Sequence, residues 1–314
     1  MLKRHKTLTA YMLALALFTS YVVMDTFVIT RVYSEAQGEE TETAILSDDT
    51  ASDSDDTDNG MSGLRAETVI TADSYSDGNI SVTISEYTVS DTTVHVAEVS
   101  TGSAAYLKTA FAQDAYGRNI TETTSDIADS VSAILAINGD YYGSQEKGYV
   151  IRNGILYRSE AKRGQEDLVI YSDGSFGIIN ESEITAEELL DAGAVQVLSF
   201  GPALVEDGSI SVSQGEEVGR AMASNPRTAI GVKADGTYLF VVSDGRTEEN
   251  AGLSLYELAE VMEALGAETA YNLDGGGSST MVFNGTVVND PTGGRAGHGS
   301  GSERKVSDIV YIGY

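Results

Sequence analysis

The stretch YNLDGGGSST, residues 271–280, places three consecutive glycines between an aspartate and a run of hydroxyl side chains. Glycine weakens ordinary helices and strands, so this run indicates a sharp turn or the close approach of another group to the backbone. A Walker loop would need lysine where the chain has Gly277, and a nucleophile elbow would need glycine where it has Thr280. What remains is a nest of N–H donors at Gly275–Ser278, which suits an anion such as phosphate.

Three further stretches place polar side chains and glycine where an apolar run ends. They are AILAINGDYYG with Asn138, Gly139 and Asp140, NPRTAIGV with Arg227 and Thr228, and FVVSDGR with Asp244 and Gly245. Each has an ordinary explanation as a turn or a surface ion pair. Together, however, Arg227 can bind phosphate through two parallel hydrogen bonds, and Asp244 and Asp274 supply the two carboxylates used in glycosidic bond cleavage. A substrate containing both a phosphate and a sugar would use all of these groups.

The elements that must position these residues are mostly strands. Alternation of apolar and polar residues predicts strands at 79–89, 92–99 and 306–314, and a hairpin at 227–245 that turns at Asp235 and Gly236. Helical patterning is found at 124–132, 185–191 and 254–265. In the last of these, Ser254 and Glu257 have the spacing of a capping box. The mixed order predicts an α+β domain with a largely antiparallel sheet core and a few flanking helices.

The N-terminus has the pattern of a membrane signal. Lys3, Arg4, His5 and Lys6 precede an uncharged run from 7 to 24, and apolar residues continue to Ile29. A spanning helix needs about 20 apolar residues, and basic residues tend to remain in the cytoplasm. We therefore expect a cytoplasmic segment at 1–6, a transmembrane anchor at 7–30 and an extracytoplasmic remainder. Cleavage near Ser34–Ala36, which would give a secreted protein, is the alternative.

Composition separates an acidic linker from the folded domain. Residues 35–58 contain many Asp and Glu and no Lys or Arg, which predicts a disordered linker at 31–65 that leads into a domain at 66–314. The formal net charge of −29 argues against nucleic acid as a partner. Because the chain has no cysteine and three histidines, thiol chemistry and a His-rich zinc site are excluded. Oxygen ligands for Ca²⁺ or Mg²⁺ exist, but nothing indicates a required cofactor.

In order along the chain, AINGDYYG, NPRTAIGV, VVSDGR, YNLDGGGSSTMV and ERKVSDIVYIGY resemble the phosphodiester glycosidase family. The resemblance covers about residues 80–314 and is most specific in the glycine-rich block. It implies a hydrolase that removes a sugar, with N-acetylglucosamine expected, by cleaving the C1–O bond of a sugar-1-phosphodiester. The N-terminal segments lie outside the resemblance and are similar to those of bacterial surface proteins. The implied substrate is therefore a phosphorylated surface glycopolymer or its precursor.

The resemblance also implies roles for single residues. It assigns the catalytic positions to Asp274, Asp244 and Asn138, and the substrate-binding positions to Gly139, Arg227, Thr228, Gly275, Gly276, Gly277, Ser278 and Thr280. No metal ligand is implied. Position 140 is acidic or small in the family, so Asp140 is a weaker catalytic candidate.

Two other classes of function fit the same sequence. A non-catalytic phosphoglycan-binding module would keep the glycine nest and Arg227 but would not need both aspartates. A factor for the assembly of exopolysaccharide or of the cell envelope is compatible with the enzyme and concerns its pathway.

Overall fold

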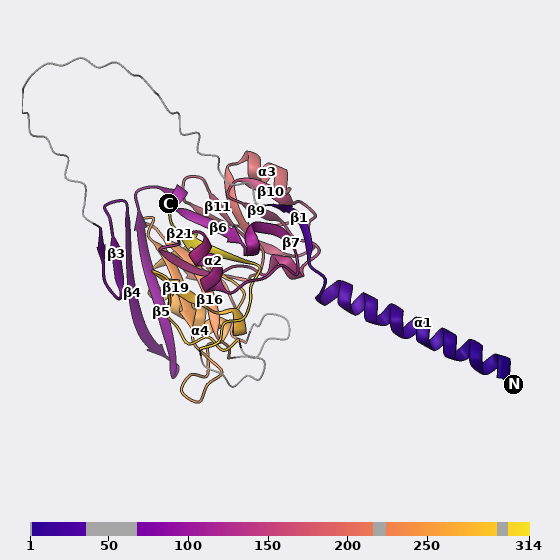
Figure 1. Ribbon diagram of the computed structural model, residues 1–314. Helices are drawn as coiled ribbons and strands as arrows, with labels where there is room; N and C mark the ends of the chain where they lie inside the picture. The colour runs from indigo at the N-terminus through magenta and orange to yellow at the C-terminus, as the bar shows by residue number, and fades with distance from the viewer. Residues whose placement is uncertain (1, 36–67, 216–223, 294–300) are drawn as a thin grey trace, which may run out of the picture.

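The computed structural model of the 314-residue chain describes residues 2–35, 68–215, 224–293 and 301–314. Its strands pair antiparallel in each named ladder and form four sheets, with few helices around them (Figure 1). This arrangement confirms the predicted α+β class. The helices are α1 (Leu2–Phe27), α2 (Thr124–Ser130), α3 (Ala186–Asp191) and α4 (Leu255–Ala264), with 3₁₀ turns at Ala104–Tyr106, Ala112–Asp114, Tyr142–Ser144 and Gly276–Ser278.

The largest sheet has nine strands and contains the predicted hairpin. In spatial order they are β15 (Ser209–Ile210), β14 (Ala203–Glu206), β18 (Ala267–Asn272), β16 (Arg227–Lys233), β17 (Tyr238–Ser243), β5 (Thr92–Thr101), β4 (Ile80–Val89), β3 (Ser74–Ser76) and β2 (Val69–Ile70). Strands β16 and β17 are joined by the expected turn, in which Gly236 adopts a φ of +86°. Because β18 lies directly beside β16, the glycine loop and Arg227 are carried by neighbouring strands.

A five-stranded sheet packs against this one and carries the second group of predicted site residues. Its order is β20 (Thr286–Val287), β19 (Met281–Phe283), β8 (Leu135–Asn138), β21 (Asp308–Ile312) and β6 (Leu107–Phe111). Strand β21 is the predicted closing strand, and all five of its residues are buried. It pairs with β8 so that Ile309 lies opposite Asn138.

The remaining strands form two smaller sheets. One contains β10 (Ile155–Arg158), β9 (Val150–Arg152), β13 (Ala194–Leu198), β11 (Glu166–Tyr171) and β12 (Phe176–Asn180), and α3 covers it. The other pairs β1 (Arg31–Glu35) with β7 (Ala115–Arg118).

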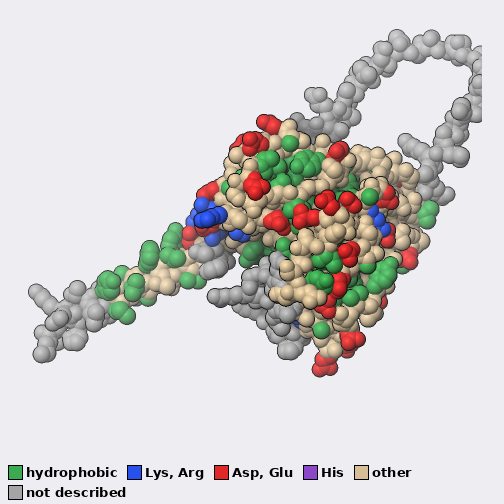
Figure 2. Space-filling view, turned by 180° about the vertical axis from the view of Figure 1, so that it is seen from behind, with side chains coloured by type: hydrophobic (Ala, Val, Ile, Leu, Met, Phe, Trp, Pro, Cys, Tyr) green, Lys and Arg blue, Asp and Glu red, His purple; other side chains and the backbone are tan. Residues whose placement is uncertain are grey.

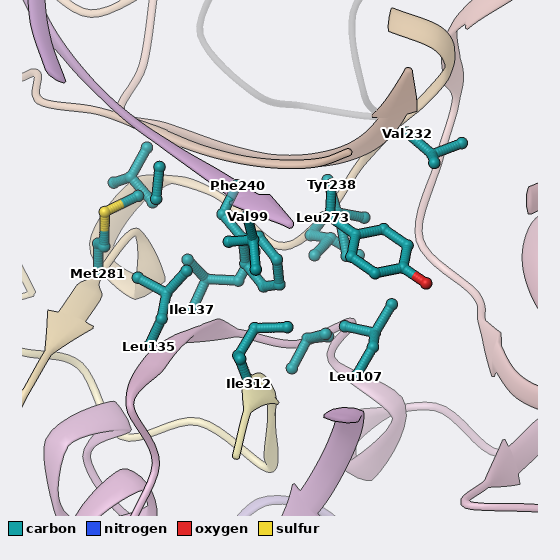
Figure 3. Packing of buried hydrophobic residues seen from close by; sticks show 14 of the residues in the cluster. Val99, Leu107, Leu135, Ile137, Val232, Tyr238, Phe240, Leu273, Met281 and Ile312 are labelled. Carbon is teal, nitrogen blue, oxygen red and sulfur yellow. The ribbon is translucent and has the colours of Figure 1, made fainter. Parts of the chain in front are cut away.

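The main hydrophobic core lies between the nine-stranded and five-stranded sheets (Figure 3). Alternate residues of β17, including Phe240, enter this core together with Ile137 and Ile312, whereas Leu239 and Val241 belong to a second cluster under α4. Strand β17 is therefore buried on both faces, which explains its continuous apolar sequence. Each fully buried side chain of this size contributes about 1.5–3 kcal/mol.

Helix α4 begins as the sequence predicts. Ser254 Oγ accepts a hydrogen bond from Glu257 N at 3.2 Å, and Glu257 Oε2 accepts one from Ser254 N at 2.8 Å. This reciprocal pair satisfies two N–H groups that the first turn leaves without helical partners. The helix then places Leu258 and Met262 on the outer face of the nine-stranded sheet, which fixes the strands that carry the glycine loop.

The predicted membrane anchor is not supported. Residues 2–27 do form α1, which projects from the folded body (Figure 1), but no helix in the described parts of the chain is long and apolar enough to cross a membrane. Thr19, Ser20 and Asp25 interrupt the apolar character of its C-terminal half. The predicted linker begins with an ordered strand, because Arg31–Glu35 form β1. Its remainder, 36–65, lies outside the described residues.

The surface has the acidic character that the composition predicts. Figure 2 shows Asp and Glu side chains scattered over the face opposite to that of Figure 1, with few Lys or Arg among them. A formal net charge of −29 repels polyanions. A group of cationic side chains in such a protein therefore gives a positive potential only in its immediate surroundings.

A buried ion triad supports the turn that follows β8. Arg152 donates to Asp140 Oδ2 at 2.9 Å and, through Nε and Nη2, to Asp308 Oδ2 at 3.0 and 2.8 Å. All three side chains are almost fully buried, and a Cβ at Gly139 would overlap the Asp308 carboxylate. Burial, together with the charge of Asp140, raises the pKa of Asp308 to about 7. Asp140 therefore holds the turn in place and is enclosed by protein.

A second buried acid, Asp167 on β11, has the Glu181 carboxyl group and the Ser199 hydroxyl as its neighbours. Burial and then the neighbouring Glu181 raise the pKa of Asp167 to about 9. The folded protein thus keeps this proton up to about pH 9, whereas the unfolded chain loses it near the usual pKa of 3.8. Unfolding releases a proton across that window, so Asp167 makes the protein less stable as the pH rises through it.

Asp167→Asn should therefore stabilise the protein at pH 8. The amide imitates the neutral acid and can donate to Glu181, so we expect a gain on the order of 1 kcal/mol or more in the free energy of unfolding. The gain should shrink toward pH 4, measured by urea unfolding at several pH values. The control is Asp173→Asn, since Asp173 accepts hydrogen bonds from Ser175 that lower its pKa. That variant should show no gain, and a loss of stability at pH 8 in Asp167→Asn would contradict the assignment.

Candidate functional site

Asp274 begins the glycine loop immediately beyond β18, where its backbone N donates to Gly139 O at 3.2 Å. Its Oδ2 accepts hydrogen bonds from Ser278 Oγ at 2.7 Å and from Arg304 Nη2 at 2.6 Å. Burial raises the pKa of Asp274, and the positive charge of Arg304 opposes that rise. The carboxylate is thus partly desolvated and paired with a cation, which is typical of a functional acid.

A cavity of about 160 Å³ lies beside Asp274. Polar and aromatic side chains line it, among them Thr121, Tyr141, Ser144, Ser278, Arg304 and Lys305. Two of these are cationic and four carry hydroxyl groups, so the cavity combines partners for an anion with partners for a polyhydroxylated ligand. Among the described residues, no group of three or more His, Asp or Glu is arranged to hold a metal ion.

Asn138 joins three chain segments behind this cavity. Its Nδ2 donates to Asp274 O at 2.6 Å, and its Oδ1 accepts from Thr228 Oγ1 at 2.8 Å and Thr280 N at 3.2 Å. The side chain is fully buried and both of its polar atoms are occupied. The sequence brought these residues together correctly, but Asn138 and Thr228 lie behind the cavity and position Asp274. The Thr280 hydroxyl is buried without a hydrogen-bond partner among the described residues.

The three glycines allow close packing of the loop against its surroundings. A Cβ at Gly275 would lie 2.9 Å from Pro226 O, one at Gly276 would lie 2.7 Å from Arg246 Nη2, and one at Gly277 would lie 3.1 Å from Gly293 Cα. Gly276 also adopts a φ of +63°, which favours glycine. Backbone atoms therefore crowd Gly275 and, less tightly, Gly277, whereas Gly276 is favoured chiefly by its φ because Arg246 Nη2 is the end of a flexible side chain.

The expected nest of free N–H donors is only partly present. Gly276 N donates to Pro226 O at 2.8 Å, and Ser278 N donates to Gly275 O at 3.3 Å. Gly275 N–H instead points to the Asp274 carboxylate, where it lowers the pKa of that group, although burial outweighs this effect. Most amides of the loop thus have protein partners, and anion binding must depend chiefly on side chains.

Three arginines surround the glycine loop. Arg304 bonds Asp274 and Ser278, Arg246 lies against Gly276, and Arg227 lies under Gly275. Burial, and then repulsion from Arg304 and Arg227, lowers the pKa of Arg246. Guanidinium groups that lie close together can bind an anion, and among these three Arg304 lines the cavity.

Arg227 occupies a deeper position than its predicted role suggests. It is buried, and its Nε donates to Leu253 O at 2.9 Å. It does not line the cavity, whereas Arg304 does. Its direct contact with a ligand stays a prediction.

Asp244 lies in a hydrogen-bond network beside the C-terminal end of the glycine loop. Its Oδ1 accepts from Asp290 N at 2.8 Å and Asn289 Nδ2 at 3.4 Å, and its Oδ2 lies 3.4 Å from His95 Nε2. Asn289 Nδ2 also donates to Ser279 O, so this network supports the loop from behind. Asp244 is not among the residues that line the cavity beside Asp274. Its catalytic role stays a prediction.

Sequence reasoning gave no site role to Arg246, Arg304, Lys305 or Tyr141, although Arg246 stood out as part of FVVSDGR. The signal was present, because all four occur inside the motifs VVSDGR, ERKVSDIVYIGY and AINGDYYG. What the motifs did not disclose is that Arg304, 30 residues beyond Asp274, folds back onto its carboxylate.

Comparison with known proteins agrees with this geometry. A sequence profile described as phosphodiester glycosidase matches residues 132–313. Human N-acetylglucosamine-1-phosphodiester alpha-N-acetylglucosaminidase is 33% identical over 207 residues, which is 60% of this chain and 39% of the human protein. An uncharacterised prophage-derived protein of Bacillus subtilis, YomE, is 29% identical over 204 residues, which is 63% of this chain and 31% of that protein. The chain thus spans between about a third and two fifths of these curated relatives.

Solved structures share the fold. The zebrafish N-acetylglucosamine-1-phosphodiester alpha-N-acetylglucosaminidase catalytic domain, auto-inhibited by its pro-peptide, superposes with a TM-score of 0.60 at 22% identity. The match covers 75% of this chain and 83% of the zebrafish chain. A hypothetical protein from Synechocystis gives a TM-score of 0.51 at 17% identity over 74% of this chain and 62% of the other. These identities establish similarity of fold alone.

The packing of the loop yields a prediction for Gly275→Ala. The added Cβ would lie 2.9 Å from the backbone oxygen of Pro226, so the loop must shift, and we expect a loss of about 1–3 kcal/mol in the free energy of unfolding. The control is Gly102→Ala, where the new Cβ would lie 3.6 Å from its nearest neighbour, Asn79 O. Urea unfolding of both variants measures the difference. If Gly275→Ala and Gly102→Ala change the free energy of unfolding by the same amount, the loop has room for a side chain at position 275.

Proposed function

Because the chain belongs to the phosphodiester glycosidase family, we propose that it hydrolyses the glycosidic bond of a sugar-1-phosphodiester at the cavity beside Asp274. The observation that carries this proposal is the Asp274 carboxylate, which lines the cavity together with Arg304 and is bonded to it at 2.6 Å, while Arg246 lies against the same loop. A phosphodiester supplies the anion that the guanidinium groups bind. The sugar beside it develops positive charge at C1 as the bond breaks, which a carboxylate stabilises.

The reaction adds water across the C1–O bond. The bond between C1 and the phosphate oxygen breaks, the oxygen of water bonds to C1, and the phosphate departs as an anion while a proton is released. Phosphate is a good leaving group and gains little from protonation. The work of the protein is therefore to bind the phosphate, to stabilise the sugar cation and to direct water.

Arg304 would couple substrate binding to the state of Asp274. Without substrate its Nη2 lies 2.6 Å from Asp274 Oδ2 and its Nε lies 2.7 Å from Ser278 Oγ. A bound phosphate competes for the same guanidinium, which leaves the carboxylate free to act on C1. Asp274 then serves as nucleophile or as the base that directs water, and Asn138 holds the backbone from which it projects.

The expected sugar is N-acetylglucosamine, and the expected substrate is a phosphorylated surface glycopolymer or its precursor. The names of the mammalian relatives support the sugar. The basic and apolar N-terminus and the acidic stretch at 35–58 support work outside the cytoplasm. A non-catalytic binding module is the competing function, and it has no need of a carboxylate placed against a bound anion.

The test is to incubate the full chain with UDP-N-acetylglucosamine, or with a simple diester of N-acetylglucosamine 1-phosphate, in ¹⁸O-labelled water. We expect free sugar and a phosphate product that contains no ¹⁸O, because the C1–O bond is the one that breaks. Label in the phosphate would indicate cleavage of the P–O bond instead. Binding of the diester without release of sugar would support the binding module.

Asp274→Asn should reduce turnover by about a thousandfold or more, since it removes the charge that acts on C1. Amide and carboxylate have the same shape, so the melting temperature should change little. Removing a negative charge from beside the phosphate should leave binding unchanged or tighter, measured by calorimetry with UDP-N-acetylglucosamine. If the variant unfolds while its folded fraction keeps wild-type turnover, Asp274 is a structural residue.

A further inference from the structure

Tyr141 has a backbone conformation that a bulky residue rarely adopts. It lies in the turn after β8 with φ +78° and ψ 17°, in the left-handed region that favours glycine or asparagine. Neighbouring bonds impose this conformation, because Asp140 N donates to Asp308 Oδ1 at 3.3 Å and Tyr142 N donates to Asp140 Oδ1 at 3.0 Å. The buried ion triad thus fixes the backbone independently of the Tyr141 side chain. Strained residues of this kind concentrate at functional sites.

Among the described residues, no hydrogen bond or ring contact gives the side chain of Tyr141 a structural role. It is 45% exposed, whereas the adjacent Tyr142 is buried against Phe111 and Tyr116. Tyr141 precedes the 3₁₀ turn Tyr142–Ser144 without making a side-chain capping bond. In the part of the chain that the structure describes, its ring stacks on no other aromatic ring. Asparagine or glycine would satisfy the backbone better, so the ring itself must be what is useful.

Tyr141 lines the same cavity as Asp274 and Arg304. Arg304, Ser278 and Asp274 form one hydrogen-bonded group on that cavity. The turn that carries Tyr141 contributes Ser144, and Ser307 is adjacent, because a Cβ at Gly143 would overlap the Ser307 hydroxyl. The cavity therefore has a cationic group beside the carboxylate, and an aromatic ring with nearby hydroxyl groups.

We propose that Tyr141 is the platform on which the sugar ring lies, with its C1 directed toward Asp274. This inference rests on the proposed function and assigns the sugar half of the substrate. An aromatic face carries partial negative charge and is apolar, and it complements the C–H groups on the flat face of a pyranose ring. Hydroxyl groups such as that of Ser144 can then bond the equatorial hydroxyls at the rim, while Arg304 holds the phosphate.

The test compares two substitutions in the full chain with UDP-N-acetylglucosamine as the probe. Tyr141→Asn removes the ring and suits the left-handed backbone, so KM should rise at least about tenfold with a melting temperature equal to or above that of the wild type. Tyr141→Phe keeps the ring and should recover most of the binding. The control is Tyr87→Thr, since Tyr87 is similarly exposed at 47% but lies on β4 and does not line the cavity. It should match the wild type.

Binding measurements can distinguish contacts to the sugar half of the substrate from contacts to its phosphate half. In chains that carry Asp274→Asn, calorimetry should show that Tyr141→Asn weakens the binding of UDP-N-acetylglucosamine but leaves the binding of UDP unchanged. A wild-type KM in Tyr141→Asn, or equal weakening of both ligands, would overturn the proposal, as would a lowered melting temperature that accounts for the loss. If the wild type releases no sugar but Tyr141 still strengthens binding of the sugar nucleotide relative to UDP, the proposed hydrolysis is wrong and the proposed role of Tyr141 is supported. If the wild type releases sugar and replacing Tyr141 changes neither KM nor binding, the hydrolysis is supported and the role of Tyr141 is wrong.

Discussion

One buried amide holds the site together. Asn138 ends a strand of the five-stranded sheet, and its side chain bonds the backbone of Asp274, the hydroxyl of Thr228 and the backbone of Thr280. Because these partners come from the ends of strands in both large sheets, the two layers of the fold must meet in one register for the amide to be satisfied. An unpaired amide at a fully buried position would be costly, so this requirement selects one packing of the sheets.

The electrostatics of the site depend on cationic and anionic side chains that lie close together. Arg304 is paired with the Asp274 carboxylate, and Arg246 lies against the same loop. A second ion group is buried in the fold, where Arg152 is paired with Asp140 and Asp308. That triad supports a turn and is enclosed by protein, whereas Asp274 and Arg304 line a cavity that a ligand can enter.

The sequence allowed prediction of features that depend on local rules. The capping box of Ser254 and Glu257, the turn at Gly236 and the buried strand Asp308–Ile312 follow from spacing and composition. Contacts between distant segments could not be read in this way. The motifs named the segments that meet at the cavity, but only the structure shows their contacts. In it, Gly276 N donates to Pro226 O, and Arg304 lines the cavity whereas Arg227 does not. The basic residues and apolar run near the N-terminus predicted a membrane anchor, but no helix in the described parts of the chain is long and apolar enough to cross a membrane.

The ladder between β1 and β7 changes the topology of the N-terminal part of the chain. Strand β1 is held against Ala115–Arg118, and Asn119 Nδ2 donates to Ile29 O at 3.0 Å, while β2 starts the edge of the nine-stranded sheet. Strands β1 and β2 thus each pair with another strand of the folded chain. A single proteolytic cut between β1 and β2 would leave α1 attached without any covalent connection, in the manner of a two-chain protein. Release of the domain would then require the β1–β7 hydrogen bonds to break, so it would be controlled by the unfolding of one short strand.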